Sequence, residues 1–160
     1  MAVLRNSSIV NLEEFHKGIA MYQCIIHATD LQEQHLHYCE QAVEIARAFK
    51  AELFLLHVLS LPSSWQIAQG LGFAETQPLP TQNAEMVMQA LAEQFNLHQN
   101  HLLLRQGNTR QTILDTIIEL QADLLIIGTA SNPLPQGEFT HLSHYLADHA
   151  PSHVLLMRPQ

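Results

Sequence analysis

The residues with the clearest chemical potential lie near the end of the chain, where the pattern is typical of a phosphate-binding turn. An apolar run, Leu124–Ile127, stops at Gly128, and a later run, Val154–Met157, closes the segment. A phosphate cradle between such strands uses backbone N–H groups and needs glycines wherever the backbone approaches the ligand. Only Gly128 and Gly137 lie between the two runs. The sequence therefore predicts a crevice of the right kind whose phosphate loop is degenerate.

Eleven histidines raise the question of metal binding. His141 and His144 share one face of a predicted helix, but no cysteine or carboxylate at ligand spacing completes a tetrahedral set. We therefore expect no metal site. A pH response through the histidines stays open, because their charge changes near neutral pH, and no local feature singles one of them out.

The sequence also lacks the common signatures of catalysis. It contains no Gly-x-Ser-x-Gly elbow, no Walker lysine and no His-Glu-x-x-His motif. Ser143 lies near His144 and Asp148, but these spacings are typical of a helix rather than of a catalytic triad. We expect that the protein is not an enzyme.

The size and charge of the chain limit its partners. At 160 residues it is long enough for one domain with its own core. The formal net charge of -8 argues against nucleic acid and anionic membranes, since both favour Lys and Arg. Cys24 and Cys39 lie in apolar segments and are expected to be buried thiols in a reducing compartment. Because the N-terminal residues contain no continuous apolar stretch, we expect neither a signal peptide nor a membrane span, and a cytoplasmic protein.

Short apolar runs alternate with helical periodicity along the chain. The runs have the composition of strands that are covered on both faces. They are Tyr22–Ala28, Leu53–Val58, His101–Arg105, Leu124–Ile127 and Val154–Met157. Between them, apolar residues recur at three- and four-residue steps, which predicts helices. Strands joined through helices run parallel, and right-handed crossovers place helices on both faces, so the pattern predicts a doubly wound α/β domain.

Local signals refine the helices and their connections. Leu36 begins the apolar face of the first helix, and Val87 lies on the predicted buried face of the second, for which Thr81 is a plausible cap. Asn108 or Thr109 can cap the third helix. The connection over residues 62–80 contains Pro and Gly and suits a surface loop.

The first twenty residues stand apart from this alternation. Asn11–Glu14 resembles a capping box and is followed by a weak apolar stripe. Three interpretations stay open for residues 1–20: a short helix docked on the domain, an extension frayed in solution, and an arm that stabilises a dimer.

Five markers occur in a fixed order along the chain. They are Ile25–Asp30, a strand that ends in an aspartate; Leu55–Val58, a second strand end; Gly107, before the third helix; Ala122–Thr129, a strand that stops at a glycine; and His149–Arg158, which closes the chain. Together they resemble the universal stress protein family over roughly residues 21–158. The resemblance makes residues 21–160 the universal stress protein domain and residues 1–20 an N-terminal extension.

The resemblance implies a five-stranded parallel sheet in the order 3-2-1-4-5, with helices on both faces, of the adenine nucleotide alpha hydrolase-like kind. Chain order reverses between strands one and four, and open α/β sheets bind ligands beyond the carboxyl ends at such a reversal. The implied residues of an adenine-nucleotide crevice are Asp30, Val58, Gly128, Ser131, His141, Leu142 and Ser143.

Two of these positions have structural alternatives. Asp30 accepts hydrogen bonds from an adenine or ribose in one interpretation, and forms an Asx turn or caps the first helix in the other. Val58 and its neighbour His57 edge an adenine pocket or belong to the core.

The phosphate loop departs from the pattern of the nucleotide-binding members that the chain resembles. Gly128 matches their first glycine, but Ser131 occupies the position of the second. Thr140 and His141 stand where those members have a glycine-serine pair, although Ser143 keeps a later hydroxyl. Side chains at these positions obstruct the close approach of the backbone.

The rest of the loop is equally unsuited to phosphates. Pro133 and Pro135 remove N–H donors, and Glu138 adds negative charge. No Lys or Arg lies between Gly128 and Arg158. We therefore expect weak or absent ATP binding, with AMP or ADP slightly less impaired, and no bound cofactor.

The last strand indicates a partner of another kind. An unpaired apolar edge is a template for a second chain, and the resemblance implies that Val154–Met157 pairs across a two-fold axis in a homodimer. The sequence thus predicts a non-catalytic, cytoplasmic stress-response module that acts on unknown protein partners. The alternative is an adenine-nucleotide sensor that binds ATP or AMP through Asp30, Val58, Gly128 and Ser143.

Overall fold

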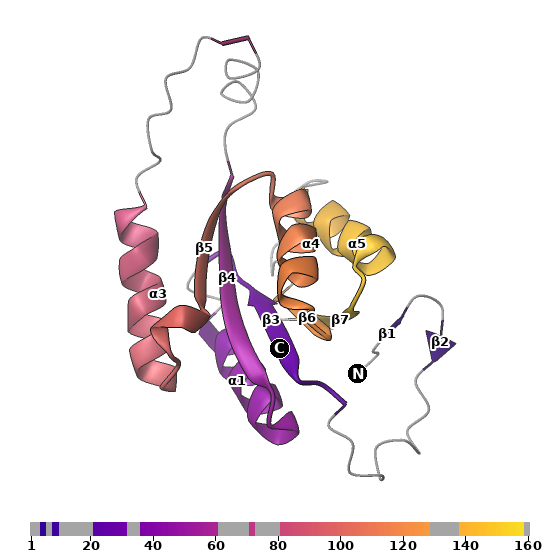
Figure 1. Cartoon of the computed structure of the whole chain (residues 1–160), viewed down its shortest axis with the longest axis horizontal. Coiled ribbons are helices and arrows are strands. Elements are labelled where there is room, and N and C mark those ends of the chain that lie inside the picture. The colour runs from indigo at the N-terminus through magenta and orange to yellow at the C-terminus, as the bar shows by residue number, and fades with distance from the viewer. Residues whose placement is uncertain are drawn as a thin grey trace.

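A sheet forms the centre of the protein, and helices cover both of its faces (Figure 1). The computed structural model describes residues 4–5, 8–9, 21–31, 36–60, 71–72, 81–128 and 138–158, with backbone only at 4–5, 8–9 and 138–141. Within these ranges, the strand order is β2-β1-β7-β6-β3-β4-β5.

Five of these strands are parallel and make up the predicted sheet. They are β3 (Cys24–Ala28), β4 (Glu52–Ser60), β5 (Leu102–Gly107), β6 (Leu124–Gly128) and β7 (His153–Met157). The order β5-β4-β3-β6-β7 is the predicted order 3-2-1-4-5, which is therefore confirmed. The expected third strand begins one residue late, because His101 belongs to a short 3-10 helix, η3 (Gln99–His101).

Two pairs of helices form the outer layers. They are α1 (Leu36–Phe49) and α3 (Gln82–Phe95) on one face, and α4 (Thr109–Leu120) and α5 (Glu138–His149) on the other. The first pair packs on residues such as Ile25, Leu55 and Ile126, and the second on Ile26 and Leu125. Neighbouring strand residues thus enter opposite cores, as the alternation of side chains along a strand requires.

The helix signals in the sequence are partly confirmed. The side chain of Asn108 caps α4 by accepting a hydrogen bond from the Gln111 backbone N–H at 3.2 Å. Thr81 occupies the cap position of α3, but its side chain makes no cap hydrogen bond. Leu36 and Val87, expected on buried faces, are 45% and 40% exposed. These two positions lie at the margin of their stripes, where periodicity alone does not decide burial.

The carboxylate of Asp123 ties the amino ends of β3 and β6 together. It accepts hydrogen bonds from the backbone N–H groups of Gln23 and Cys24, at 2.8 and 3.0 Å. The two strands are thereby held in the parallel register that pairs Ile25 with Leu124. Their carboxyl ends, where a ligand crevice is expected, are consequently aligned.

Two short strands extend the sheet beyond β7. The strands β1 (Leu4–Arg5) and β2 (Ser8–Ile9) are antiparallel to each other, and β1 pairs antiparallel with β7 through Leu4 and Val154. The sequence analysis predicted no strand here, because two-residue strands are too short to show a period-two pattern. The possible helix after Asn11, one of the three interpretations of residues 1–20, lies outside the described residues, as does the connection over residues 62–80 apart from a turn at 71–72.

Cys24 and Cys39 are free thiols, the first partly exposed and the second buried. Burial, with a smaller contribution from Asp123, raises the pKa of Cys24 to about 11. Burial also raises the pKa of Cys39 to about 11, although a hydrogen bond with Thr29 opposes the rise. Across the described part of the chain, no helix is both long and apolar enough to cross a membrane.

Candidate functional site

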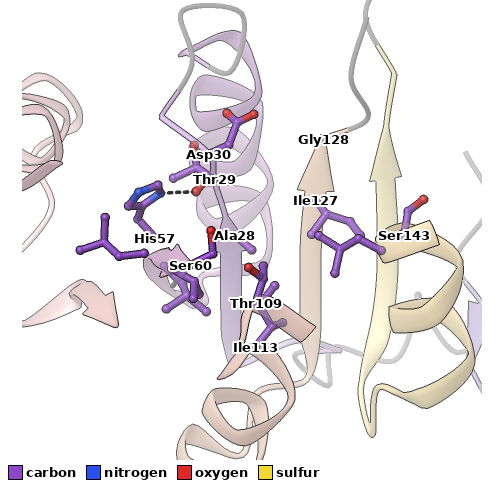
Figure 2. Close-up of a pocket in the computed structure, with 14 residues that line it drawn as sticks. Ala28, Thr29, Asp30, His57, Ser60, Thr109, Ile113, Ile127, Gly128 and Ser143 are labelled. Atoms are coloured by element: carbon purple, nitrogen blue, oxygen red, sulfur yellow. Dashed lines mark hydrogen bonds between the residues drawn. The ribbon is translucent and has the colours of Figure 1, made fainter. Parts of the chain in front are cut away.

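A pocket of about 440 Å³ opens at the carboxyl ends of β3, β4 and β6, with α4 and α5 as its other walls. Figure 2 shows Asp30 and Thr29 at the end of β3, and Ser143 on α5 beyond β6. This is the reversal point of the sheet, since β3 lies between β4 and β6. The helix that follows β3, α1, packs on one face of the sheet, and the helix that follows β6, α5, packs on the other.

Most of the residues expected in the crevice come together in this pocket. Those that line it are Asp30, Val58, Gly128, Leu142 and Ser143. Ser131 lies outside the described residues, and His141 is part of α5 with an undescribed side chain. Their proposed contacts with a ligand stay predictions.

Sequence reasoning missed several other residues of the lining. They include Thr29, Ser60, Thr109 and Ile113, which come from the ends of β3 and β4 and from the first turns of α4. The available signal was positional, because each follows a strand or opens a helix at the carboxyl edge of the sheet. No motif in the sequence marks Thr109 or Ile113 as neighbours of Asp30.

The turn after β3 is organised by Thr29. Its backbone N–H donates to the Leu56 carbonyl at 2.9 Å, and its Oγ1 accepts a hydrogen bond from the Leu31 N–H at 3.1 Å. The side chain of Thr29 thus contributes to this turn. Residues 32–35, between the turn and α1, lie outside the described part of the chain, so the Asx turn or helix cap expected at Asp30 stays a prediction.

His57 on β4 is held by the same turn. Its Nδ1 donates to the Thr29 carbonyl at 2.8 Å, as the dashed line in Figure 2 marks. Because a carbonyl only accepts, the proton of this hydrogen bond is on Nδ1. The hydrogen bond fixes the orientation of the half-buried ring, which lines the pocket.

Gly128 has a packing role that does not depend on a ligand. The ring of Tyr38, which is 2% exposed, lies against the end of β6. A Cβ added at position 128 would overlap this ring. The glycine is therefore required for α1 to sit on the sheet, whether or not a phosphate approaches its backbone.

The charge of the lining is unsuited to phosphates. Among the described residues that line the pocket, Asp30 is the only carboxylate and none is Lys or Arg. Arg110, next to Thr109, holds its guanidinium 5.1 Å from the ring centre of Tyr145 and joins α4 to α5 outside the lining. An aromatic base and a sugar suit such a mainly apolar pocket better than a polyphosphate does.

The described residues of α5 do not bring Ser143, His144 and Asp148 together in the pocket. His144 and Asp148 are exposed on α5 and do not line the pocket, although Ser143 does. In the part of the chain that the structure describes, no three His, Cys, Asp or Glu side chains gather where they could hold a metal ion.

The parallel strand order and the pocket at the reversal point define a doubly wound α/β protein with a ligand crevice. A family model described as the universal stress protein family matches residues 21–158. The chain belongs to the universal stress protein family. Universal stress protein A homolog 2 of Coxiella burnetii is 26% identical over 91 residues, which are 56% of this chain and 62% of that relative's length.

Solved structures share the fold at low sequence identity. A universal stress protein in complex with cAMP superposes with a TM-score of 0.61 at 17% identity, over 86% of this chain and 97% of the other. Universal stress protein UspA of Lactobacillus plantarum gives 0.61 at 23% identity, over 86% and 98%. A universal stress protein of Archaeoglobus fulgidus gives 0.59 at 20%, over 91% and 98%.

Proposed function

We propose that this universal stress protein is a non-catalytic stress-response module whose crevice does not seat a nucleoside triphosphate. The observation that carries the proposal is the described lining of the pocket, in which Asp30 is the one carboxylate and no residue is Lys or Arg. Phosphates are bound through Lys, Arg or glycine-rich backbone, and each negative charge added near Asp30 is repelled.

The sequence of the adjoining loop supports the same conclusion. Ser131 and Thr140 replace glycines at the positions where backbone N–H groups would meet phosphates, and Pro133 and Pro135 remove two donors. Gly128 remains, but the Tyr38 ring already requires a glycine there. Its retention is therefore no argument for a phosphate site.

The proposal also covers the cellular location of the protein and its partners. A cytoplasmic location is supported by the free thiols of Cys24 and Cys39, since reducing compartments preserve thiols. Without turnover, the protein would act through contacts, as a homodimer formed along Val154–Met157 and with protein partners of unknown identity.

The test is to look for nucleotide in the protein as it is purified. The folded protein is freed of unbound solutes, denatured with acid, and the soluble fraction is separated by ion-exchange chromatography. We expect no ATP, ADP or AMP in stoichiometric amount. A stoichiometric nucleotide peak would contradict the proposal.

One alternative function has an observation in its favour. A pocket of about 440 Å³ at the reversal point is of the size and place that small-molecule sites have in open α/β sheets, and a structural relative is in complex with cAMP. The alternative is an adenine-nucleotide sensor that binds ATP or AMP through Asp30, Val58, Gly128 and Ser143. In that case Asp30→Ala should abolish the released nucleotide, whereas Asp115→Ala, an exposed change on α4, should not.

A further inference from the structure

The strand β7 has one neighbour from the parallel sheet, β6, and its other side faces the N-terminal residues. On that side β1 pairs with it, with Leu4 opposite Val154. The chain thus covers the start of an edge that would otherwise present unpaired backbone groups to other molecules.

The covering strand is much shorter than the strand that it covers. β7 spans the five residues His153–Met157, whereas β1 and β2 have two residues each. Farther along β7, the side chain of Leu156 is 40% exposed, while its neighbours Leu155 and Met157 are buried. A short hairpin of this size is marginal by itself, so it can be displaced at low cost.

The direction of β1 matters for what else can bind. A two-fold axis beside an edge strand pairs the strand with its own copy in antiparallel orientation. β1 already runs antiparallel to β7. A second copy's β7 therefore needs the same backbone groups, in the same orientation, that β1 occupies at Val154.

We propose that the N-terminal hairpin of β1 and β2 is an intramolecular cap that competes with a second copy of this chain for the β7 edge. The inference rests on the homodimer proposed above and adds a mechanism that regulates its formation. With the hairpin in place the edge at Val154 is closed, and when the hairpin leaves, all of β7 is available to a second protomer. The occupant that replaces β1 is the longer strand and makes more hydrogen bonds.

The test displaces β1 from the β7 edge by substitution and does not shorten the chain. Proline at a paired position removes an N–H donor and prevents strand pairing, so Leu4→Pro and Arg5→Pro should release β1. The matched control is Arg5→Ala, which keeps the backbone donor. Sedimentation velocity over a dilution series should show a dimer that is about tenfold tighter in at least one proline variant than in the control and the wild type.

A cap and a dimer arm predict opposite effects of the proline variants on the dimer. If β1 were an arm that belongs to the dimer interface, the proline variants would weaken the dimer. That result would overturn the cap, and so would an unchanged dissociation constant. Adding Leu156→Lys to the tighter proline variant should return it to monomers, because the new dimer uses the same edge.

Hydrogen exchange separates a failure of the cap from a failure of the homodimer. Amides of β7, measured at a dilution where every variant is monomeric, should exchange faster in the proline variants than in Arg5→Ala. Unchanged exchange overturns the cap alone. Faster exchange without dimers at any concentration overturns the proposed homodimer and the competition together.

Discussion

The buried ring of Tyr38, on α1, lies against Gly128 at the end of β6, where a side chain would overlap it. We predict that Gly128→Ala lowers the free energy of unfolding by about 1–3 kcal/mol through overpacking. The cause can be checked in a double-mutant cycle with Tyr38→Leu, measured by urea denaturation. The alanine should be less damaging when the ring is gone, and equal losses in both backgrounds would refute the packing role.

A second prediction concerns the β7 edge. Leu156→Lys places a charge on a side chain that is 40% exposed in the single chain and would lose water in a β7–β7 dimer. The variant should fold normally and shift the equilibrium toward monomers, as light scattering can measure. Gln99→Lys, an exposed change on η3, is the control. Equal dimer fractions in the two variants would show that the dimer uses another surface.

Val154→Lys is not suited to this purpose, although the sequence alone does not show which of Val154 and Leu156 is buried in the single chain. Val154 is 5% exposed and belongs to the core beneath α5. A buried lysine there should destabilise the fold itself, so that loss of dimers would not report on the edge.

A third prediction follows from the two thiols. Because burial raises the pKa of Cys24 and of Cys39 from 9.0 to about 11, both stay protonated at pH 8 and should react slowly with a thiol reagent in the native protein. Unfolding in urea should restore normal reactivity. Fast labelling of native Cys39 at pH 8 would contradict its burial.

The same shifts make stability depend on pH. The folded pKa values lie above the unfolded value of 9.0, so the neutral thiols contribute their full stability below pH 9, and this contribution is lost as pH rises toward 11. A Cys24→Ala, Cys39→Ala double variant should lose less unfolding free energy between these pH values than the wild type. Parallel losses in the two proteins would show that other groups are responsible.

A fourth prediction uses the missing glycines. Ser131→Gly together with Thr140→Gly should strengthen ATP binding about tenfold if side chains at these positions obstruct the phosphates. Isothermal titration calorimetry on the double variant and on the wild type makes the comparison. Unchanged affinity would mean that the pocket lining, rather than the loop, limits binding.

The central strands could be predicted because their signal is strong and local. β3, β4 and β6 are covered on both faces, so they appear in the sequence as continuous apolar runs. Even His27 fits, since it is buried and its Nδ1 makes a hydrogen bond with the Ile126 carbonyl at 3.1 Å. The reversal of strand order then placed Asp30 and Gly128 at one edge.

The remaining features depend on contacts between distant parts of the chain. The packing of Tyr38 against Gly128 and the hydrogen bond from His57 to Thr29 need the folded geometry, and no spacing in the sequence encodes them. The same holds for β1, because its pairing with Val154 joins opposite ends of the chain. The burial predicted at the margins of the helix faces was wrong for a simpler reason, because an apolar side chain such as that of Leu36 tolerates exposure.

The most direct test of the account is calorimetric titration of the wild-type protein with Mg-ATP, with adenosine in a parallel experiment. No described residue of the pocket lining is Lys or Arg, and Ser131 and Thr140 stand where nucleotide-binding members of the family have glycines. Such a pocket should bind ATP no more tightly than adenosine. We predict a dissociation constant for ATP above roughly 10 μM, which corresponds to less than about 7 kcal/mol of binding. A lower dissociation constant, with ATP preferred over adenosine, would contradict the account and establish the nucleotide sensor in its place.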